Sequence, residues 1–458
     1  MAIRMSDETR DVGLSRFFNA LRECQPFRVS GRVVKVVGLV IESIGPPAHV
    51  GELCYIYISN QRSPIEAEVV GFHEGKTLLV ALDDMSGIEP GSEVVSSGRV
   101  PTALVGEALL GRVIDGLGRP LDAGEPIMSG ERYPLFSAPP GPLERLRITE
   151  HLALGVRAVD ATVTCGKGQR LGIFSGSGVG KSTLLGMFAR NTNADVNVIA
   201  LIGERGREVR EFIEKDLGPD GLKRSVVVVV TSDQAAIIRL RGAYLATTIA
   251  EYFRDVGCDV LLMMDSLTRF AMAQREIGLA IGEPPTTRGY TPSVFSAMPK
   301  LLERAGNSAT GSITGLYTVL VEADDMNEPI SDAARSILDG HIVLSRELAM
   351  ANHYPAIDVL ASISRVMIDV VDESQLHAAS RLREAMSIHR EASDLINIGA
   401  YVPGSNPKID WARSKIDEIN QFLKQSINEK ADCFATVENL KRLFKDLPEQ
   451  DRKPADDL

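Results

Sequence analysis

A glycine-rich turn between an apolar segment and a stretch of helical periodicity most constrains what this chain can fold into. The apolar segment runs from Arg170 to Phe174, and apolar residues recur at helical spacing from Leu184 to Ala189. Glycines in such a turn let successive backbone N–H groups surround phosphate oxygens, and the following helix N-terminus adds positive partial charge. The sequence therefore predicts a phosphate-binding loop and a bound nucleoside triphosphate. Its residues are Ser175, Gly176, Ser177, Gly178, Val179, Gly180, Lys181, Ser182 and Thr183.

Two side chains after the turn indicate how the triphosphate and its metal would be held. In this motif the Lys181 ammonium reaches the β- and γ-phosphates, and the Ser182 hydroxyl is a ligand of Mg²⁺. One position departs from the strict motif, which begins with glycine where this chain has Ser175. The alternative is a flexible glycine turn that only happens to precede Lys-Ser, and the strand and helix patterns on either side argue against it.

The middle of the chain has the pattern of a parallel sheet. Continuous apolar runs alternate with helical stretches, which is typical of strands buried on both faces of an α/β sheet. These runs are Val196–Ile202, Val226–Val230, Val260–Met264 and Leu316–Val321. We therefore expect an α/β fold with a phosphate-loop NTPase core built on a RecA-like parallel sheet.

The regions on either side of this core have other patterns. Near-alternating segments separated by Gly- and Pro-containing turns predict a small β-barrel over residues 28–97, and residues from 373 onward read as helical and charged. The expected domains are an N-terminal amphipathic helix in 1–27, the barrel in 28–97, the phosphate-loop core in 98–372, and a C-terminal helical domain with a disordered tail in 373–458. The expected barrel strands are Gly31–Ile41, Leu53–Ile58, Ile65–Phe72 and Thr77–Leu82.

Composition excludes several classes of protein. The chain has 50 basic and 61 acidic residues and a formal charge of −11, so no overall field draws it onto nucleic acid or anionic lipid. Its five cysteines are scattered without a C-x-x-C pair, which fits buried thiols in a reducing cytoplasm. The sequence has no apolar run long enough to span a bilayer, so only peripheral membrane association is expected.

Carboxylates at the ends of two predicted strands suit the chemistry of triphosphate hydrolysis. Asp265 ends the run that begins at Val260, where an acid can hold the water shell of Mg²⁺. Glu204 follows the first run after the loop helix and faces the expected nucleotide crevice, so it is a candidate base for the attacking water, with Glu208 supporting the metal's water. The alternative for both glutamates is a solvated helix start whose acids favour the N-terminal dipole.

Two further candidates lie late in the core. Arg365 follows Ser362-Ile363-Ser364, and an arginine in this region can serve as a finger that stabilises transition-state charge. Tyr354 could stack on adenine. A surface arginine and a packing tyrosine are the ordinary alternatives, and the residues alone favour them.

Taken together, these segments resemble the flagellar protein export ATPases and the related ATPases of virulence type III secretion, which are similar in turn to the catalytic subunits of rotary ATP synthases. The resemblance covers nearly the whole chain, in the family's order. The flagellar branch is favoured by Ser175–Gly180 and by Ile396–Tyr401. The matching segments are Ser175–Thr183, Gly203–Glu208, Asp265–Ala271, Ile281–Pro285, Gly289–Phe295, Tyr317–Glu322, Ile337–Arg346 and Tyr354–Arg365.

The resemblance assigns roles residue by residue. It makes Lys181 the phosphate lysine, Glu204 the catalytic carboxylate and Arg365 the finger that a neighbouring subunit inserts. The metal-side residues are Ser182 and Asp265. The remaining assignments are Arg205 and Arg269 as coupling arginines, Tyr354 as the adenine-stacking aromatic, Tyr401 as a second wall, and Ser175 as a tolerated small residue at the start of the loop.

A homohexamer is expected from these assignments. In the heteromeric synthases the catalytic carboxylate and the finger belong to different chains, whereas here Glu204 and Arg365 are on one chain. A ring of identical subunits could therefore complete a site at every interface, and a monomer would be nearly inactive.

The function implied by the resemblance is an ATP-driven motor for flagellar protein export, with ATP as substrate and Mg²⁺ as cofactor. It would deliver and unfold export substrates, released from their chaperones, at the membrane-embedded export gate. Residues 1–27, with the stripe Leu14–Leu21, would bind a peripheral-stalk regulator, and the C-terminal helices would contact a central stalk and the gate. The expected location is cytoplasmic, peripherally associated with the inner membrane.

Other functions are alternatives to this one. A virulence type III secretion ATPase shares most of the motifs, whereas a synthase subunit or an inert nucleotide-binding subunit fits the sequence less well. A hexameric RNA helicase would need a basic, aromatic-bearing barrel, and no nucleic-acid partner is expected because acids outnumber bases in residues 28–97. The acids are Glu42, Glu52, Glu66, Glu68, Glu74, Asp83, Asp84, Glu89 and Glu93, and the bases are Arg28, Arg32, Lys35, Arg62 and Lys76.

Overall fold

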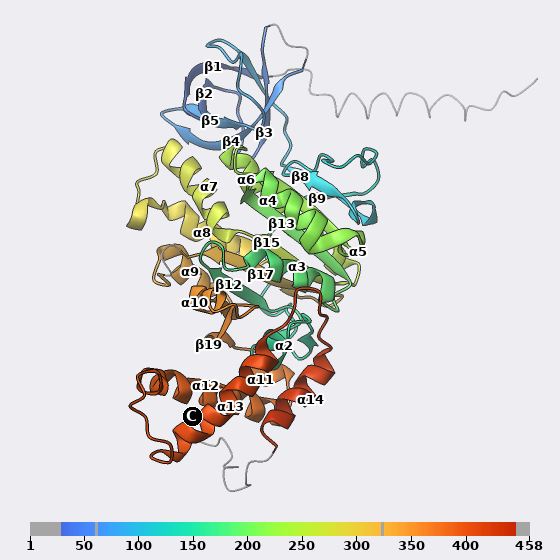
Figure 1. Cartoon of the computed structure of the whole chain (residues 1–458). Coiled ribbons are helices and arrows are strands. Elements are labelled where there is room, and N and C mark those ends of the chain that lie inside the picture. The colour runs from blue at the N-terminus through green and yellow to red at the C-terminus, as the bar shows by residue number, and fades with distance from the viewer. Residues whose placement is uncertain (1–28, 60–62, 322–324, 446–458) are drawn as a thin grey trace, which may run out of the picture. The chain divides into compact units, whose positions relative to one another are not determined.

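A computed structural model describes residues 29–59, 63–321 and 325–445 as two compact units (Figure 1). The first unit ends at Pro101 and the second begins at Thr102. The predicted helix in 1–27, the predicted tail from Pro448, and Glu322 of one matching segment lie outside the described residues. The C-terminal helices form one compact unit with the ATPase core, and the boundaries expected at 97/98 and 372/373 stay predictions.

The first unit is a closed β-barrel. Within its described residues the strand order is β1-β2-β5-β4-β3-β6, antiparallel throughout. Alternate side chains such as Ile41, Ile56 and Leu79 fill its interior and are fully buried. The predicted barrel is confirmed. Its strands are β1 (Ser30–Val37), β2 (Val40–Ile44), β3 (Leu53–Tyr57), β4 (Ile65–His73), β5 (Lys76–Ala81) and β6 (Glu93–Ser96).

One strand prediction in the barrel is wrong. The sequence pattern suggested a single strand over Gly31–Ile41, but the chain turns back after Val37 and forms the β1–β2 hairpin. Gly38 sits in this turn with φ of 58°, a left-handed conformation that glycine adopts without steric cost. Because the residues on both sides of the turn are apolar, the sequence pattern did not reveal it.

The second unit is built on one large sheet. Among its described residues the strand order is β19-β18-β12-β17-β15-β13-β14-β8, with β16 on β17. All neighbours are parallel except the β18–β19 and β16–β17 pairs. The four predicted buried runs form β13, β14, β15 and β17, so the predicted parallel sheet is confirmed. The bounds are β8 (Val113–Asp115), β12 (Arg170–Ser175), β13 (Val196–Glu204), β14 (Ser225–Thr231), β15 (Asp259–Asp265), β16 (Gly306–Asn307), β17 (Ser312–Leu320), β18 (Gly340–Leu344) and β19 (Ile357–Ser364).

Helices cover both faces of this sheet, which explains why its strands read as continuous apolar runs. Leu201 shares a core with Leu185 of α3 (Lys181–Asn191), on one face. On the other face, Ile202 and Val230 approach Gly242 of α6 (Ala236–Asp255) so closely that a Cβ at Gly242 would lie 2.5 Å from Val230. The other helices of this region are α4 (Gly206–Glu211), the π-helix η3 (Phe212–Leu217), α5 (Gly218–Lys223), α7 (Leu267–Ala280), η4 (Thr287–Gly289), α8 (Pro292–Leu302), α9 (Pro329–Ile337), α10 (Arg346–Met350) and α11 (Met367–Val370).

The segment that enters the sheet contributes small elements. These are the paired strands β7 (Thr102–Val105) and β9 (Glu131–Pro134), the turn η2 (Glu107–Leu109), the paired strands β10 (His151–Leu152) and β11 (Cys165–Gly166), and the helix α2 (Arg157–Thr162).

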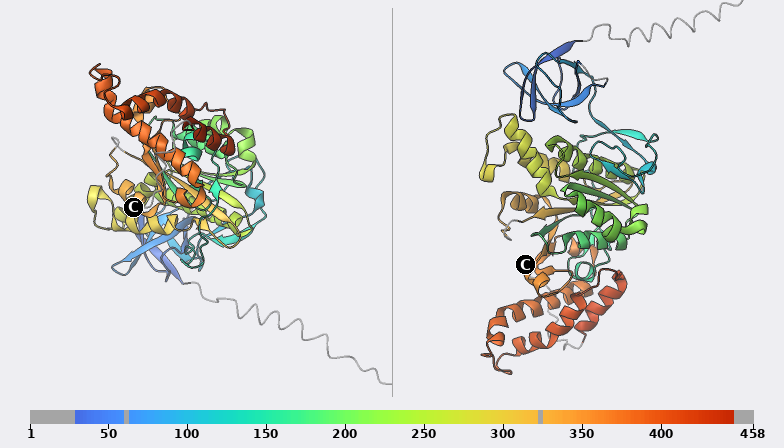
Figure 2. Two further views of the ribbon diagram at one scale, coloured as in Figure 1. Left: turned by 90° about the horizontal axis from the view of Figure 1, so that it is seen from below. Right: turned by 45° about the horizontal axis from the view of Figure 1, so that its top comes forward.

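The C-terminal helices α12 (Glu373–Asn397), α13 (Pro407–Leu423) and α14 (Cys433–Leu443) pack on one another and on α2 (Figures 1 and 2). Arg383 of α12 donates to the carbonyls of Thr162 and Ser362, at 2.7 and 3.1 Å, so α12 is bonded to the ends of both α2 and β19. The predicted C-terminal helical domain is confirmed.

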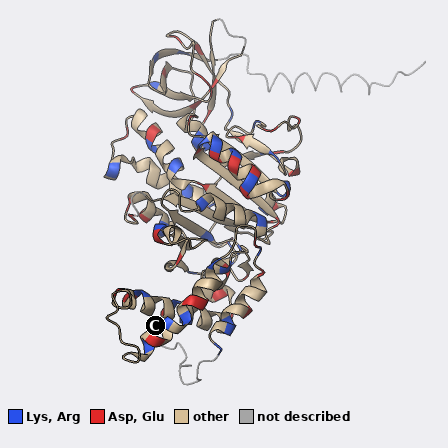
Figure 3. Ribbon diagram, in the orientation of Figure 1, with Lys and Arg blue, Asp and Glu red and all other residues tan. Residues whose placement is uncertain are grey.

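Charges of both signs alternate along the exposed helices (Figure 3). On α4 and η3, for example, Arg210 pairs with Glu214 one turn later. Of the helices in the described residues, none has an apolar stretch of the length that a bilayer crossing needs.

Candidate nucleotide site

The phosphate loop connects β12 to α3 at the carboxyl end of the sheet, where parallel α/β folds bind ligands. Gly178 and Gly180 have φ of 79° and 92°, a left-handed geometry that supplies the tight turn before the helix. Ser175 is the last residue of β12 and is not among the described residues with positive φ. A side chain is therefore compatible with the position at which the strict motif has glycine.

Lys181 lies between two carboxylates at the ends of neighbouring strands. Its Nζ is 2.5 Å from Oδ1 of Asp265, at the end of β15, and 3.5 Å from Oε1 of Glu204, at the end of β13. Thr318 of β17 also donates to Oδ1 of Asp265, at 2.7 Å. The parallel topology thus brings together the lysine and the two acids that are 23 and 84 positions apart from it in sequence.

A small cavity opens beside this cluster. Its polar lining consists of Ser182, Glu204, Glu208 and Asp265, which are the predicted metal-side and catalytic groups. Its apolar lining is Leu201, Val209 and Phe212. A water held here would contact a carboxylate base on one side and a hydrocarbon wall on the other.

The electrostatics of this cluster favour a protonatable glutamate and a charged lysine. Burial, aided by the negative charge of Asp265, raises the pKa of Glu204 to about 7, although Lys181 opposes the rise. Burial works against the ammonium of Lys181, but the two carboxylates raise its pKa above the usual value. A general base works best when its pKa lies near the working pH, so the environment of Glu204 suits that role.

The donor set fits Mg²⁺ rather than a softer metal. The cavity offers one hydroxyl and carboxylate oxygens, the hard ligands that Mg²⁺ prefers. Among the described residues, no group of three or more His, Cys, Asp or Glu side chains forms an all-protein metal cage.

The two predicted coupling arginines border the cluster differently. Arg269 packs its stem against Gly203, where a Cβ would lie 3.0 Å from that of Arg269, and its Nε is buried without a hydrogen-bond partner. Arg205 precedes α4 with a side chain that is 79% exposed and pairs with Glu208 at 3.4 Å. Arg269 is therefore beside Glu204, whereas Arg205 reaches into solvent.

The two aromatic residues predicted to line the adenine site are Tyr354 and Tyr401, and their described contacts do not bring them together. Tyr354 lies against the phosphate loop, where a Cβ on Gly180 would be 3.6 Å from Cε1 of its ring, and it is 43% exposed. The hydroxyl of Tyr401 donates to the Asn406 carbonyl and to Asp410, both in the C-terminal helical region. The role of Tyr401 stays a prediction.

Arg365 lies at the opposite end of the sheet from the phosphate loop of its own chain. Strand β18 separates the two sites. Its first residue, Gly340, pairs with Ser364, which precedes Arg365, because β19 runs antiparallel to β18. Its last residue, Leu344, pairs with Ser175 at the start of the phosphate loop. Four strand residues span about 13 Å. Arg365 is exposed and directly follows β19, at the edge of the sheet.

The sequence reasoning missed Thr318 and Phe212. Thr318 lies within a matching segment without an assigned role, and its fully buried hydroxyl could be recognised only once β17 and β15 were paired. Phe212 begins a π-helical turn, for which the sequence has no clear signal.

Comparisons with known proteins agree with this arrangement. Residues 155–364 match the ATP synthase alpha/beta family, nucleotide-binding domain, and residues 33–98 match the beta-barrel domain of the same family. Residues 371–442 match the T3SS EscN ATPase C-terminal domain. The three matches follow one another in the order of the barrel, the sheet and the C-terminal helices.

Individual relatives are similar over most of their length. The flagellum-specific ATP synthase of Bacillus subtilis is 56% identical over 403 residues, covering 88% of this chain and 92% of the relative. The type 3 secretion system ATPase of Xanthomonas euvesicatoria is 52% identical, covering 90% and 93%. The assembled ATPase EscN from the type III secretion system of enteropathogenic E. coli superposes with a TM-score of 0.86 at 47% identity, covering 90% and 99%. A second structure, of EscN with its central stalk EscO, has a TM-score of 0.83.

Proposed function

We infer the function of this chain from its family. It belongs to the ATP synthase alpha/beta family, in the group of flagellum-specific ATP synthases and type III secretion ATPases. It is an ATP-hydrolysing enzyme of flagellar type III protein export. Relatives with the flagellar name reach 56, 54 and 51% identity.

The observation that carries the proposal is the joint position of Lys181, Glu204 and Asp265 at one end of the sheet and of Arg365 at the other. Lys181 would bind the β- and γ-phosphates. Glu204 would orient and deprotonate the attacking water, and that proton would pass to its carboxylate. Ser182 and Asp265, with Glu208, would hold Mg²⁺, which when bound neutralises charge on the phosphates.

Arg365 would act on the site of an adjacent subunit. Its own phosphate loop lies at the far end of the sheet, so a chain cannot present Arg365 to the γ-phosphoryl group of its own nucleotide. A ring in which the same surface pair repeats places one finger at each pocket. We therefore propose a homohexamer with one composite site per interface.

The proposed partners follow from the relatives. EscN has been solved in complex with its central stalk EscO, and by analogy α12–α14 would meet a central stalk. Residues 1–27, outside the described part, would bind a peripheral-stalk regulator. The ring would work at the cytoplasmic face of the inner membrane, against the export gate, on export substrates delivered by chaperones.

A subunit-mixing experiment tests the composite site. Glu204→Gln would inactivate the site on the chain that carries it, and Arg365→Ala would inactivate the site on the neighbouring chain. In rings assembled randomly from equal amounts of both, about one quarter of the interfaces pair an intact Glu204 with an intact Arg365, because each condition holds half the time. About a quarter of the wild-type ATPase rate should return. Rings of normal size that stay as inactive as either parent would refute a finger supplied by the neighbour.

The export role has its own test. Expression of the chain in a flagellated bacterium that lacks its export ATPase should restore swimming, and the Glu204→Gln variant should not. If ATPase activity is restored but hook and filament proteins are not exported, the chain is an ATPase and the proposed export role is wrong.

A further inference from the structure

We propose that Gln169 is a positioning residue for hydrolysis, because its side-chain amide holds the turn that carries Arg365. The inference rests on the proposed function, in which Arg365 completes the site of an adjacent subunit. Gln169 itself touches no group of the nucleotide cluster among the described residues.

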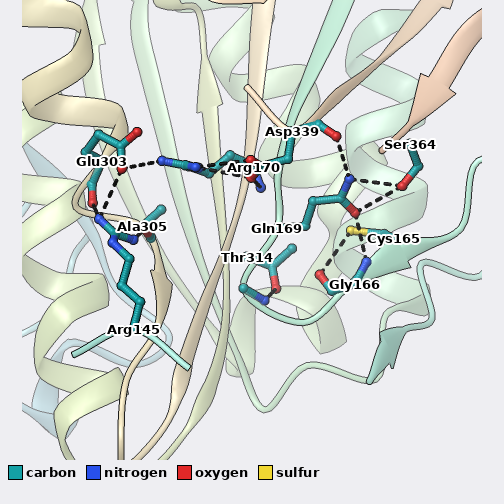
Figure 4. A network of polar contacts seen from close by, with 11 residues as sticks. Arg145, Cys165, Gly166, Gln169, Arg170, Glu303, Ala305, Thr314, Asp339 and Ser364 are labelled. Carbon is teal, nitrogen blue, oxygen red and sulfur yellow. Dashed lines mark hydrogen bonds and ion pairs between the residues drawn. The ribbon is translucent and has the colours of Figure 1, made fainter. Parts of the chain in front are cut away.

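Gln169 lies between β11 and β12 and is completely buried. Its Oε1 accepts the backbone N–H of Gly166 at 2.9 Å, and its Nε2 donates to Oγ of Ser364 at 3.0 Å. Nε2 also donates to the carbonyl of Asp339 at 3.2 Å. Figure 4 shows the amide between Asp339 and Ser364, so that one side chain joins the segments before β18 and at the end of β19.

The same carbonyl also fixes the backbone of Arg365. The N–H of Arg365 donates to the oxygen of Asp339 at 3.0 Å, so Gln169 and Arg365 share one acceptor. Gln169 thus holds both the residue before Arg365, through the Ser364 hydroxyl, and the acceptor of the Arg365 amide.

Asp339 is itself held in place by the start of β12. Its carboxylate accepts from Nε and Nη2 of Arg170 at 3.0 and 3.1 Å, and from the Arg170 backbone N–H at 3.0 Å. Arg170 also pairs with Glu303 at 2.5 Å, and Glu303 contacts Arg145 (Figure 4). Because charge-assisted bidentate pairs are geometrically specific, this network gives the Arg365 turn a rigid base.

The exposed side chain of Arg365 has little else to orient it. Its guanidinium reaches only the carbonyl of Arg335, at 3.5 Å, among the described contacts. Its direction therefore depends on where its main chain is held. Misplacing a catalytic group by about 1 Å can cost on the order of a hundredfold in rate, so a loosened turn would show in catalysis.

A purely structural role for Gln169 is the competing explanation, because any buried polar group must be satisfied. A double-mutant cycle separates the two. We would compare steady-state ATP hydrolysis by assembled wild type, Gln169→Met, Arg365→Ala and the double variant, at saturating ATP and Mg²⁺. Methionine has a flexible side chain of about the length of glutamine and makes none of its hydrogen bonds.

The proposal expects Gln169→Met to lower kcat by about ten- to a hundredfold, with the nucleotide Kd within about twofold of wild type. In the Arg365→Ala background the same change should cost less than about twofold, because the group it positions is already gone. An equal loss in both backgrounds, or a loss confined to Kd, would overturn it.

Two further variants serve as a control and as a replacement for Gln169→Met. Thr314→Val removes another buried hydrogen bond near the start of β12, the one that Thr314 Oγ1 accepts from Gly168 at 2.9 Å, without touching β19 (Figure 4). It should leave kcat near the wild-type value. If Gln169→Met does not fold, Ser364→Ala takes its place in the cycle, since it removes only the hydroxyl that meets Nε2.

The cycle also distinguishes this inference from the proposed function. If Arg365→Ala alone hydrolyses ATP at the wild-type rate, the finger is wrong and the proposed composite site fails with it. If Arg365→Ala is slow and Gln169→Met is fast, only the positioning role of Gln169 fails.

Discussion

The ammonium of Lys181 lies 2.5 Å from Oδ1 of Asp265, so the lysine that would bind phosphate is paired with the carboxylate that would hold the metal. Thr318 shares the same oxygen. The two carboxylates raise the pKa of Lys181 and so keep its ammonium charged. A phosphate bound by Lys181 would replace one of these partners.

Loss of this lysine should weaken nucleotide binding. Lys181→Met removes the charge that would meet the β- and γ-phosphates, and we expect the Kd for a fluorescent ATP analogue to rise at least about tenfold, with no turnover. Lys223→Met is a matched control, because Lys223 is 76% exposed and pairs with Asp220 away from the cavity. Equal affinity in the two variants would remove Lys181 from the site.

Glu204 should be needed for turnover but not for binding. Glu204→Gln keeps the shape of the side chain and removes its basicity, so kcat should fall by about 10²–10⁴ while ATP affinity changes little. Glu211→Gln, at the end of α4 and outside the cavity lining, serves as the control. The prediction fails if phosphate release by Glu204→Gln keeps pace with the wild type.

The pair of Arg304 and Glu251 should dominate the stability of the second unit. Arg304 is fully buried and forms two bonds to Glu251, at 2.8 and 2.5 Å. Arg304→Met strands the Glu251 carboxylate and should cost about 3–5 kcal/mol of unfolding free energy in urea denaturation.

Adding Glu251→Leu to Arg304→Met should recover much of that loss, because no charge is then left buried. Arg210→Met, which breaks the exposed pair with Glu214, is the comparison and should leave the urea midpoint nearly unchanged. A single Arg304 variant as stable as wild type would show that the pair is not a structural requirement.

Asp160 should make stability depend on pH. Complete burial raises the pKa of this carboxyl to about 7, despite backbone N–H donors from Leu154 and Gly155. Between about pH 4 and 7 the folded chain then binds more protons than the unfolded chain, so this group's contribution falls as pH rises and levels off above about 7.

Asp160→Asn removes the carboxyl that takes up the proton. The stability of wild type relative to Asp160→Asn, compared as urea midpoints at about pH 5 and about pH 8, should be lower at the higher pH. A pH-independent difference would mean that Asp160 keeps an ordinary carboxyl pKa in the folded chain.

Much of the fold and of the nucleotide site could be read from the sequence because the signals are local. The phosphate loop is contiguous, and the strands β13 and β15 are apolar runs that end at Glu204 and Asp265. The hairpin turn at Gly38 was not predicted because apolar residues lie on both sides of it, and the π-helical turn at Phe212 was not predicted because a π-helix has no clear sequence signal.

The sequence alone determined which residues could perform triphosphate chemistry, since loop glycines, a lysine and strand-end acids act through their identity and spacing. Only the tertiary structure decided where Arg365 lies relative to its own phosphate loop and what Gln169 contacts. The antiparallel pairing of β19 with β18 sends Arg365 to the far end of the sheet, and strand order brings Gln169 to Ser364 across 195 positions of sequence. Hydrogen-bond pairing between distant strands sets both relationships, and composition or local periodicity carries no record of it.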